Sequence, residues 1–191
     1  MLELEKDYVQ MCIDWNKARY EQTHNLQLSI KLLDEEVKEL KAADSKVAIL
    51  DACGDITFVA VGILWKVGMS DENIKEIMYG TNLTTLGEEE ALLKIATGYV
   101  NLVPLLVCEL PNYEAAIGVF YALNAIFFMA LPAIRELGLQ SKFYDVFGAI
   151  CVSNATKTAH RVTPDVKANI IKGSNYKAPT EALEAILRSV N

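Results

Sequence analysis

Apolar residues recur every three or four positions along most of the chain, and this spacing indicates helices that bury one face. In the first such segment, one face carries Leu4, Tyr8, Met11 and Trp15. Few segments alternate with the two-residue period of a strand. We therefore predict an all-α helical bundle. In its first half, helices are expected over about 3–20, 26–43, 46–67 and 72–79.

Two local signals mark the ends of these helices. The third helix is expected to end at Gly68, because glycine readily adopts the left-handed conformation that closes many helices. Ser70 or Asp71 then caps the next helix. Near the end of the first helix, Asn16 begins a polar cluster that continues to His24. This cluster either contacts a ligand or only closes the turn.

Acidic residues on two neighbouring helices are the most informative feature of the chain. Glu35, Glu36 and Glu39 share one helical face, and Asp51 and Asp55 share one face of the next helix. Such glutamates are often solvated, but Asp55 runs directly into the apolar stretch ITFVAVGILW. An unpaired carboxylate there is costly, so we expect a positive partner. Because no His or Cys clusters with these oxygens, we predict Mg²⁺, with Mn²⁺ as the next candidate.

Composition limits the class of protein. The chain has 191 residues, 52% of them hydrophobic, and a formal net charge of −7, which fits one domain over 1–191. The acidic balance argues against a nucleic-acid partner, whereas a metal-loaded site still attracts a phosphorylated small molecule. The four cysteines are widely spread without a CxxC pair, and the charged start has no secretory leader. Reduced cysteines and a cytoplasmic location are therefore expected.

One apolar run, residues 117–134, is long enough to be considered as a membrane span. It contains Gly118, Tyr121, Asn124 and Pro132, and it would fit only a bilayer of marginal thickness. We interpret it as a buried helix of the bundle and expect no membrane partner.

The second half of the chain resembles the first when residue numbers are shifted by 70. The shift pairs Leu40 with Leu110 and Gly68 with Gly138, and a further shift of two pairs TNLTT with SNATK. We predict two tandem, diverged helical repeats, at about 22–85 and 94–157, and a tail at 158–191 that ends in a short helix. The positive residues that begin at the end of repeat two and continue through the tail are Lys157, Arg161, Lys167, Lys172 and Lys177.

The second repeat has lost most of the acids of the first. Glu109 remains opposite Glu39, but uncharged residues stand opposite the others, namely Leu106 for Glu36, Tyr121 for Asp51 and Ala125 for Asp55. Conversely, the first repeat has Thr85 where the second has Lys157. These complementary losses predict one composite site, in which Asn154 and Lys157 reach the acids of the first repeat.

Four short motifs follow one another along the chain: EEVKEL at 35–40, DACGD at 51–55, SNATK at 153–157 and IKGSNYKAP at 171–179. The first two resemble the acidic signature of the all-α nucleoside triphosphate pyrophosphohydrolases, the superfamily of MazG, phosphoribosyl-ATP pyrophosphohydrolase and the dimeric dUTPases. The last two are similar to segments of a phage and bacterial branch of phosphoribosyl-ATP pyrophosphohydrolase-like proteins. The chain departs from the signature at Ala52, where the family has an acid, and Asp51 is expected to supply that carboxylate.

The resemblance implies a Mg²⁺-dependent enzyme that hydrolyses a nucleoside triphosphate to its monophosphate and pyrophosphate. Such chemistry depends on neutralising and aligning the phosphates, which carboxylate-held metal and lysines can do. The implied metal ligands are Glu36, Glu39, Asp51 and Asp55, with Glu35 as a further ligand or the base that orients water. The implied substrate contacts, with the lysines on phosphate oxygens, are Asn16, Asn154, Lys157, Lys172 and Tyr176.

Two other functions stay open from the sequence. One is a phosphoribosyl-ATP pyrophosphohydrolase of histidine biosynthesis, although the duplicated chain is longer than a single four-helix unit. The other is a non-catalytic helical scaffold, which does not explain why one complete acidic set survives while the other is lost. Single-repeat members of the family pair as dimers, so the chain resembles a fused dimer and is expected to be a monomer or a homodimer.

Overall fold

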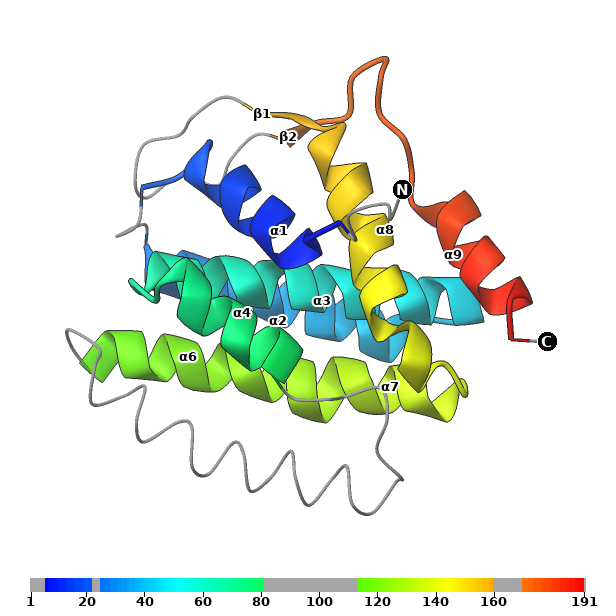
Figure 1. The fold of residues 1–191 in the computed structure, drawn as a ribbon, viewed down its shortest axis with the longest axis horizontal. Helices are drawn as coiled ribbons and strands as arrows, with labels where there is room; N and C mark the ends of the chain where they lie inside the picture. Colours follow the sequence, from blue (N-terminus) through cyan, green and yellow to red (C-terminus); the bar gives the residue numbers. More distant parts are fainter. Residues whose placement is uncertain (1–5, 22–24, 81–112, 160–169, 191) are drawn as a thin grey trace, which may run out of the picture.

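The computed structural model describes residues 6–21, 25–80, 113–159 and 170–190. Helices pack around one buried helix, α3, and two very short strands pair near the end of α8 (Figure 1). The predicted all-α class is confirmed. In chain order the elements are α1 (Tyr8–Lys17), α2 (Leu26–Ala42), α3 (Lys46–Lys66), α4 (Asp71–Gly80), α6 (Tyr113–Ala125), η1 (Ile126–Ala130), α7 (Leu131–Glu136), η2 (Gln140–Lys142), α8 (Phe143–Ala155), β1 (Thr158–Ala159), β2 (Ile170–Ile171) and α9 (Thr180–Arg188).

The helices predicted over 26–43, 46–67 and 72–79 agree with α2, α3 and α4 to within one residue at each end. Side-chain caps explain this agreement, because an oxygen just before a helix accepts a hydrogen bond from an otherwise unpaired backbone N–H. Asn25 caps α2, Ser45 caps α3, and Ser70 accepts from the Asn73 N–H at 3.2 Å at the start of α4. The first helix, predicted over 3–20, begins only at Tyr8, after its cap Asp7, and ends at Lys17.

Helix α3 forms the centre of the core. It contacts α1, α2, α6, η1, α7, α8 and α9, so most of the bundle is built on it. Leu50, Ile56, Ile63 and Leu64 of this helix have no exposed surface. Burial on nearly all sides explains why the apolar run 56–65 lacks a polar stripe. Asp51 and Asp55 therefore lie on the central helix of the described bundle, at positions that stay partly exposed.

Helices α3 and α7 end in the same way. Gly68 has φ 95° and Gly138 has φ 73°, the left-handed region that favours glycine. The Met69 N–H donates to the Leu64 carbonyl at 3.3 Å, and the equivalent bond after Gly138 has a length of 3.1 Å. These paired bonds close each helix in a Schellman motif. The shift by 70 residues anticipates this match, but the tandem repeat as a whole stays a prediction.

Helices α6, η1 and α7 form one continuous apolar segment over 113–136. Pro132 lies in the first turn of α7, directly after the π-helical turn η1, where its missing N–H and its ring disturb regular α-helical bonding. Two helices, Lys46–Lys66 and Tyr113–Glu136, are long and apolar enough to cross a membrane, and their apolar windows are 67% and 56% buried within the protein. Such burial is typical of core helices in a bundle.

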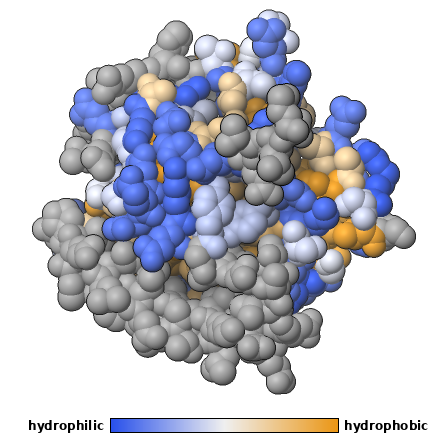
Figure 2. Space-filling model, in the orientation of Figure 1, coloured by the Kyte–Doolittle hydropathy of each residue, from blue (hydrophilic) through white to orange (hydrophobic). Residues whose placement is uncertain are grey.

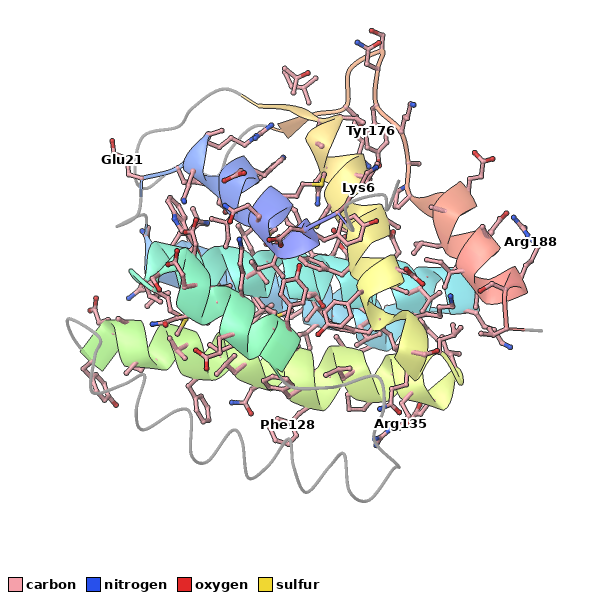
Figure 3. All side chains as sticks on the ribbon, viewed as in Figure 1. Lys6, Glu21, Phe128, Arg135, Tyr176 and Arg188 are labelled. Carbon is pink, nitrogen blue, oxygen red and sulfur yellow. The ribbon has the colours of Figure 1, made fainter. Side chains whose placement is uncertain are left out.

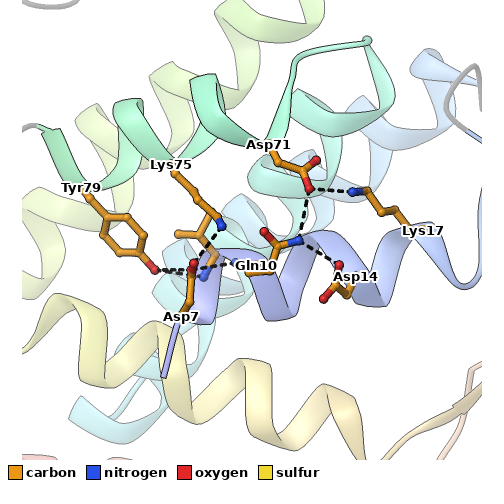
Figure 4. Close-up of polar contacts among 8 residues, drawn as sticks. Asp7, Gln10, Asp14, Lys17, Asp71, Lys75 and Tyr79 are labelled. Carbon is orange, nitrogen blue, oxygen red and sulfur yellow. Dashed lines mark hydrogen bonds and ion pairs between the residues drawn. The ribbon is translucent and has the colours of Figure 1, made fainter. Parts of the chain in front are cut away.

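Polar contacts attach α4 to α1 (Figure 4). Lys17 pairs with Asp71 at 2.6 Å, and Lys75 pairs with Asp7 at 2.9 Å. The Tyr79 hydroxyl donates to Asp7 Oδ1 at 2.8 Å. Figure 2 shows that this face is mainly hydrophilic, with hydrophobic residues gathered toward α9. These exposed ion pairs orient α4 but contribute little to stability.

Several predictions concern residues outside the described ranges. They include the polar triplet 22–24, the motif TNLTT at 81–85, Cys108, Glu109, Arg161 and Lys167. The other three cysteines, Cys12, Cys53 and Cys151, are buried as free thiols. The tail ends in a short helix, α9, as predicted.

Candidate functional site

A pocket opens between α1, α2, α3 and the end of α8, and it contains most of the predicted site residues. Helix α2 contributes Glu35 and Glu36, and α3 contributes Asp55. Asn154 and Lys157 enter from the end of α8, and Asn16 enters from α1. A wider groove between α8 and α9 contains none of the predicted residues. We therefore take the first pocket as the candidate site.

Glu36 and Asp55 are two partly buried acids of the pocket. Burial raises the pKa of Glu36 to about 8, and the negative charges of Asp55, Glu39 and Glu35 raise it further than Lys157 lowers it. Burial likewise raises the pKa of Asp55 to about 7, with Asp51 and Glu39 adding to the effect. The two acidic helix faces therefore meet, as the sequence predicts. Their charges are only partly compensated by protein groups.

Asp51 lies one helical turn before Asp55. The negative charge of its carboxylate is likewise only partly compensated by protein groups. Its Oδ1 atom is buried and has no hydrogen-bond partner in the described part of the chain. Burial raises the pKa of the carboxyl, against the opposing charge of Lys157. A buried unpaired carboxylate oxygen is costly, so it calls for a cation.

The acidic residues have the chemistry of a divalent-metal site. Their donors are all carboxylate oxygens, which suit Mg²⁺ or Mn²⁺, and their negative charge is only partly compensated. Glu36, Glu39, Asp51 and Asp55 are the residues that would hold the ion. Among the described residues, however, no three His, Cys, Asp or Glu side chains lie close enough together to hold an ion as they stand. Like charges without a cation between them are expected to stay apart.

The end of α8 is fixed against α1, which positions Asn154 and Lys157. The Trp15 indole N–H donates to the Asn154 carbonyl oxygen at 2.9 Å. Arg19 lies over the Trp15 ring at 4.2 Å and donates to the Lys157 carbonyl oxygen at 3.4 Å. Lys157 also lowers the pKa of Glu36, Asp51 and Asp55, so its charge acts on the acids of the first half. The structure thus brings Asn154 and Lys157 to the pocket that Glu36 and Asp55 line, whereas Glu39 and Asp51 do not line it.

The tail folds back beside this site. Thr158 pairs with Ile171 in a short antiparallel ladder, and the Lys177 N–H donates to the Thr156 hydroxyl oxygen at 3.0 Å. This places Lys172 where its charge lowers the pKa of Asp51 and Asp55. Tyr176, labelled in Figure 3, lies under both lysines: its ring centroid is 4.9 Å from Lys172 Nζ and 5.9 Å from Lys157 Nζ. Lys172 and Tyr176 do not themselves line the pocket.

Asn16 is 3% exposed and lies against Gly62 of α3. Its amide nitrogen donates to the Cys12 carbonyl oxygen at 2.9 Å, which leaves the amide oxygen for other contacts. A Cβ atom at Gly62 would lie 2.9 Å from that oxygen, so glycine at this position gives the asparagine its room. The polar cluster that begins at Asn16 therefore faces the pocket at this residue.

The sequence reading missed Lys66, the last residue of α3, which also lines the pocket. Its Nζ donates to Ser29 Oγ at 3.3 Å and lies 4.0 Å from the Tyr20 ring centroid. Burial lowers the pKa of Lys66 to about 8. The residue spacing could have indicated Lys66, since it lies on the same helical face as Asp55. Phe58 and Gly62 connect the two at steps of three and four. A lysine at a helix end is ordinary, so this spacing did not stand out.

The comparisons with known proteins agree with this geometry. Residues 15–82 match the family described as phosphoribosyl-ATP pyrophosphohydrolase. No significant match is found among curated proteins or solved structures. The matched segment contains both acidic faces and ends before Asn154 and Lys157. The family generally depends on a divalent metal, and the match supports a nucleotide pyrophosphohydrolase activity. Residues 15–82 are therefore similar to a family of the MazG-like all-α nucleoside triphosphate pyrophosphohydrolase superfamily, whose members are hydrolases that act on phosphoric anhydride bonds.

Proposed function

We propose that the protein hydrolyses a nucleoside triphosphate, of the ribo or deoxyribo series, to the monophosphate and pyrophosphate. The observation that carries this proposal is the composite pocket. Partly compensated carboxylates of α2 and α3 meet Asn154 and Lys157 from the other half of the chain, beside Lys172. A divalent cation bound with the triphosphate supplies the positive charge that the carboxylates lack.

The residues have separate tasks in the proposed reaction. Bound Mg²⁺ would neutralise phosphate charge, and Glu36, Glu39, Asp51 and Asp55 would hold it. Lys157 and Lys172 bind phosphate oxygens as point charges. Glu35, which is exposed at the pocket rim, orients a water and accepts its proton as the water oxygen attacks the α-phosphorus. The bond to the bridging oxygen then breaks, and pyrophosphate leaves.

Phosphoribosyl-ATP is the second candidate substrate, because the matching family carries its name. Both substrates contain the same α–β anhydride bond, so the acidic residues do not distinguish them. The two candidates differ in the group attached to the base. That group would lie at the end of the pocket away from the acids. We also propose that one chain forms one composite site, so that a monomer suffices, and that the protein works in the cytoplasm on the nucleotide pool.

A substrate panel tests the proposal. The purified chain is assayed for pyrophosphate release with Mg²⁺ and each of the ribonucleotides, the deoxyribonucleotides and phosphoribosyl-ATP. We expect release from at least one nucleoside triphosphate, with loss of activity on chelation and recovery with Mg²⁺ or Mn²⁺. Release from phosphoribosyl-ATP alone would favour the second candidate. No release from any of them would favour the non-catalytic scaffold.

A further inference from the structure

Lys66 lies at the opposite end of the pocket from the acids, on the same face of α3. The positions Asp55, Phe58, Gly62 and Lys66 follow steps of three and four. Eleven residues separate Asp55 from Lys66, which corresponds to about 16 Å along the helix at 1.5 Å per residue. An extended nucleotide with its phosphates at the acids therefore has its base directed toward Lys66.

The Lys66 ammonium group has hydrogen-bonding capacity that the described residues do not use. Its contacts there are Ser29 Oγ at 3.3 Å and the face of the Tyr20 ring at 4.0 Å. No carboxylate in the described part of the chain is among the groups that act on its charge. An ammonium carries three donors, so at least one remains for a ligand. Burying such a group without a partner is costly, which makes a ligand partner valuable.

The pocket walls between Lys66 and the acids suit a planar base better than a phosphate. Tyr20 and Phe58 are aromatic, Leu32 and Val59 are aliphatic, and all four line the same pocket. Trp15 lies edge-on to Phe58, with ring centroids 5.2 Å apart. Phosphate oxygens are better served at the other end, where Lys157 and Lys172 act on the acids. Lys66, which lies over the Tyr20 ring, is thus separated from the two lysines that face the acids.

We propose, on the basis of the proposed function, that Lys66 determines base specificity by donating a hydrogen bond to a carbonyl oxygen on the edge of the substrate's nucleobase. A carbonyl oxygen accepts with two lone pairs, whereas adenine carries at the same ring position an amino group, which an ammonium cannot pair with. The preferred substrates are then nucleotides of the keto bases uracil, thymine or guanine, whereas cytosine presents an amino group at that position, as adenine does. A site built around a buried donor rejects a ligand that leaves the donor unpaired.

The test compares Lys66→Met with Lys41→Met, a matched control at an exposed position near the end of α2. Steady-state kinetics are measured with dUTP, dTTP, dCTP, dGTP and dATP. For the best keto-base nucleotide, Lys66→Met is expected to lower kcat/KM by about tenfold or more, mainly through KM, as for one lost charged hydrogen bond. For dATP the change is expected to stay below about twofold. Lys41→Met should match the wild type on every nucleotide.

Two results would overturn the inference: an equal loss on all five nucleotides, or no loss on any. If Lys66→Met does not fold, Ser29→Ala takes its place, since it removes the oxygen that holds the ammonium, and an unchanged ratio between dUTP and dATP then counts against the inference. If the wild type hydrolyses no nucleotide, the proposed function fails by itself. Calorimetric titration with dUMP and dAMP then decides the role of Lys66: tighter dUMP binding that Lys66→Met abolishes supports it, and indifference to the base overturns it.

Discussion

At the scale of single residues, the candidate site consists of ionisable groups that the fold keeps in unfavourable surroundings. Asp55 and Glu36 are acids whose pKa burial raises to about 7 and about 8, and Lys66 is a base whose pKa burial lowers to about 8. Each therefore holds its charge at a cost in folding stability. The arrangement is expected of a site that is completed by a ligand, because the ligand supplies what the protein lacks.

Asp55→Asn separates the effect of this carboxylate on stability from its effect on activity. The amide keeps the shape and removes the charge, so the free energy of unfolding without metal should hold or rise by about 1 kcal/mol or more. Hydrolysis should be lost, because a ligand of the proposed cation is gone. Urea unfolding in the presence of a chelator measures the first effect, and pyrophosphate release measures the second. Normal turnover by Asp55→Asn would remove this residue from the site.

Lys66 predicts a pH dependence of stability. Between its folded pKa of about 8 and its ordinary value of 10.5, the unfolded chain binds a proton that the folded chain has lost. Stability contributed by this group therefore rises as pH increases across that window and is lowest below it. The free energy of unfolding of Lys66→Met should exceed that of the wild type by the most near neutral pH. This difference should shrink by up to about 3 kcal/mol toward the top of the window. Urea unfolding of both proteins at the two ends of the window checks it, and a constant difference would contradict a lowered pKa.

At the scale of elements, sequence predicts what local chemistry decides. The bounds of α2, α3 and α4 were predictable because periodicity and the caps at Ser45 and Ser70 act within a few residues. The π-helical turn η1 was not, since it depends on how a long apolar helix accommodates Pro132 while packing on α3. The strands β1 and β2 are two residues each, too short for any periodic pattern. Lys66 joins the site only through the packing of α1 and α2 on α3.

Gly68→Ala and Gly138→Ala test the matching ends of α3 and α7. Both glycines have positive φ, and a Cβ atom added at either would meet no other atom within 4 Å. The cost is therefore backbone strain alone, about 1 kcal/mol in each variant. Urea unfolding should give similar losses for the two, and activity should not change, because neither residue lines the pocket. Clearly unequal losses would show that the two helix ends are not equivalent.

At the scale of the whole molecule, both halves of the chain line the candidate pocket. The acids come from α2 and α3, whereas Asn154 and Lys157 come from the end of α8, which the Trp15 indole N–H holds at 2.9 Å through the Asn154 carbonyl. The sequence predicted this meeting from complementary losses in the two halves rather than from any local motif. It did not predict that Lys172 and Tyr176 lie outside the pocket lining, because their position depends on the path of the tail.

Lys157→Ala tests the composite site directly. If Lys157 binds phosphate oxygens, its loss should weaken transition-state binding by about 1.5–3 kcal/mol, roughly a tenfold to 150-fold drop in kcat/KM. Mn²⁺ binding without nucleotide should barely change, since the proposed ligands all come from the first half. Lys177→Ala is the matched control, because Lys177 is an exposed lysine of the tail that lines the other groove. Glu109→Gln alters the one residue of the acidic set that the second repeat retains. It should also leave the kinetics unaltered. Wild-type kinetics in Lys157→Ala would mean that the end of α8 approaches the acids for a structural purpose and that the first half binds its nucleotide alone.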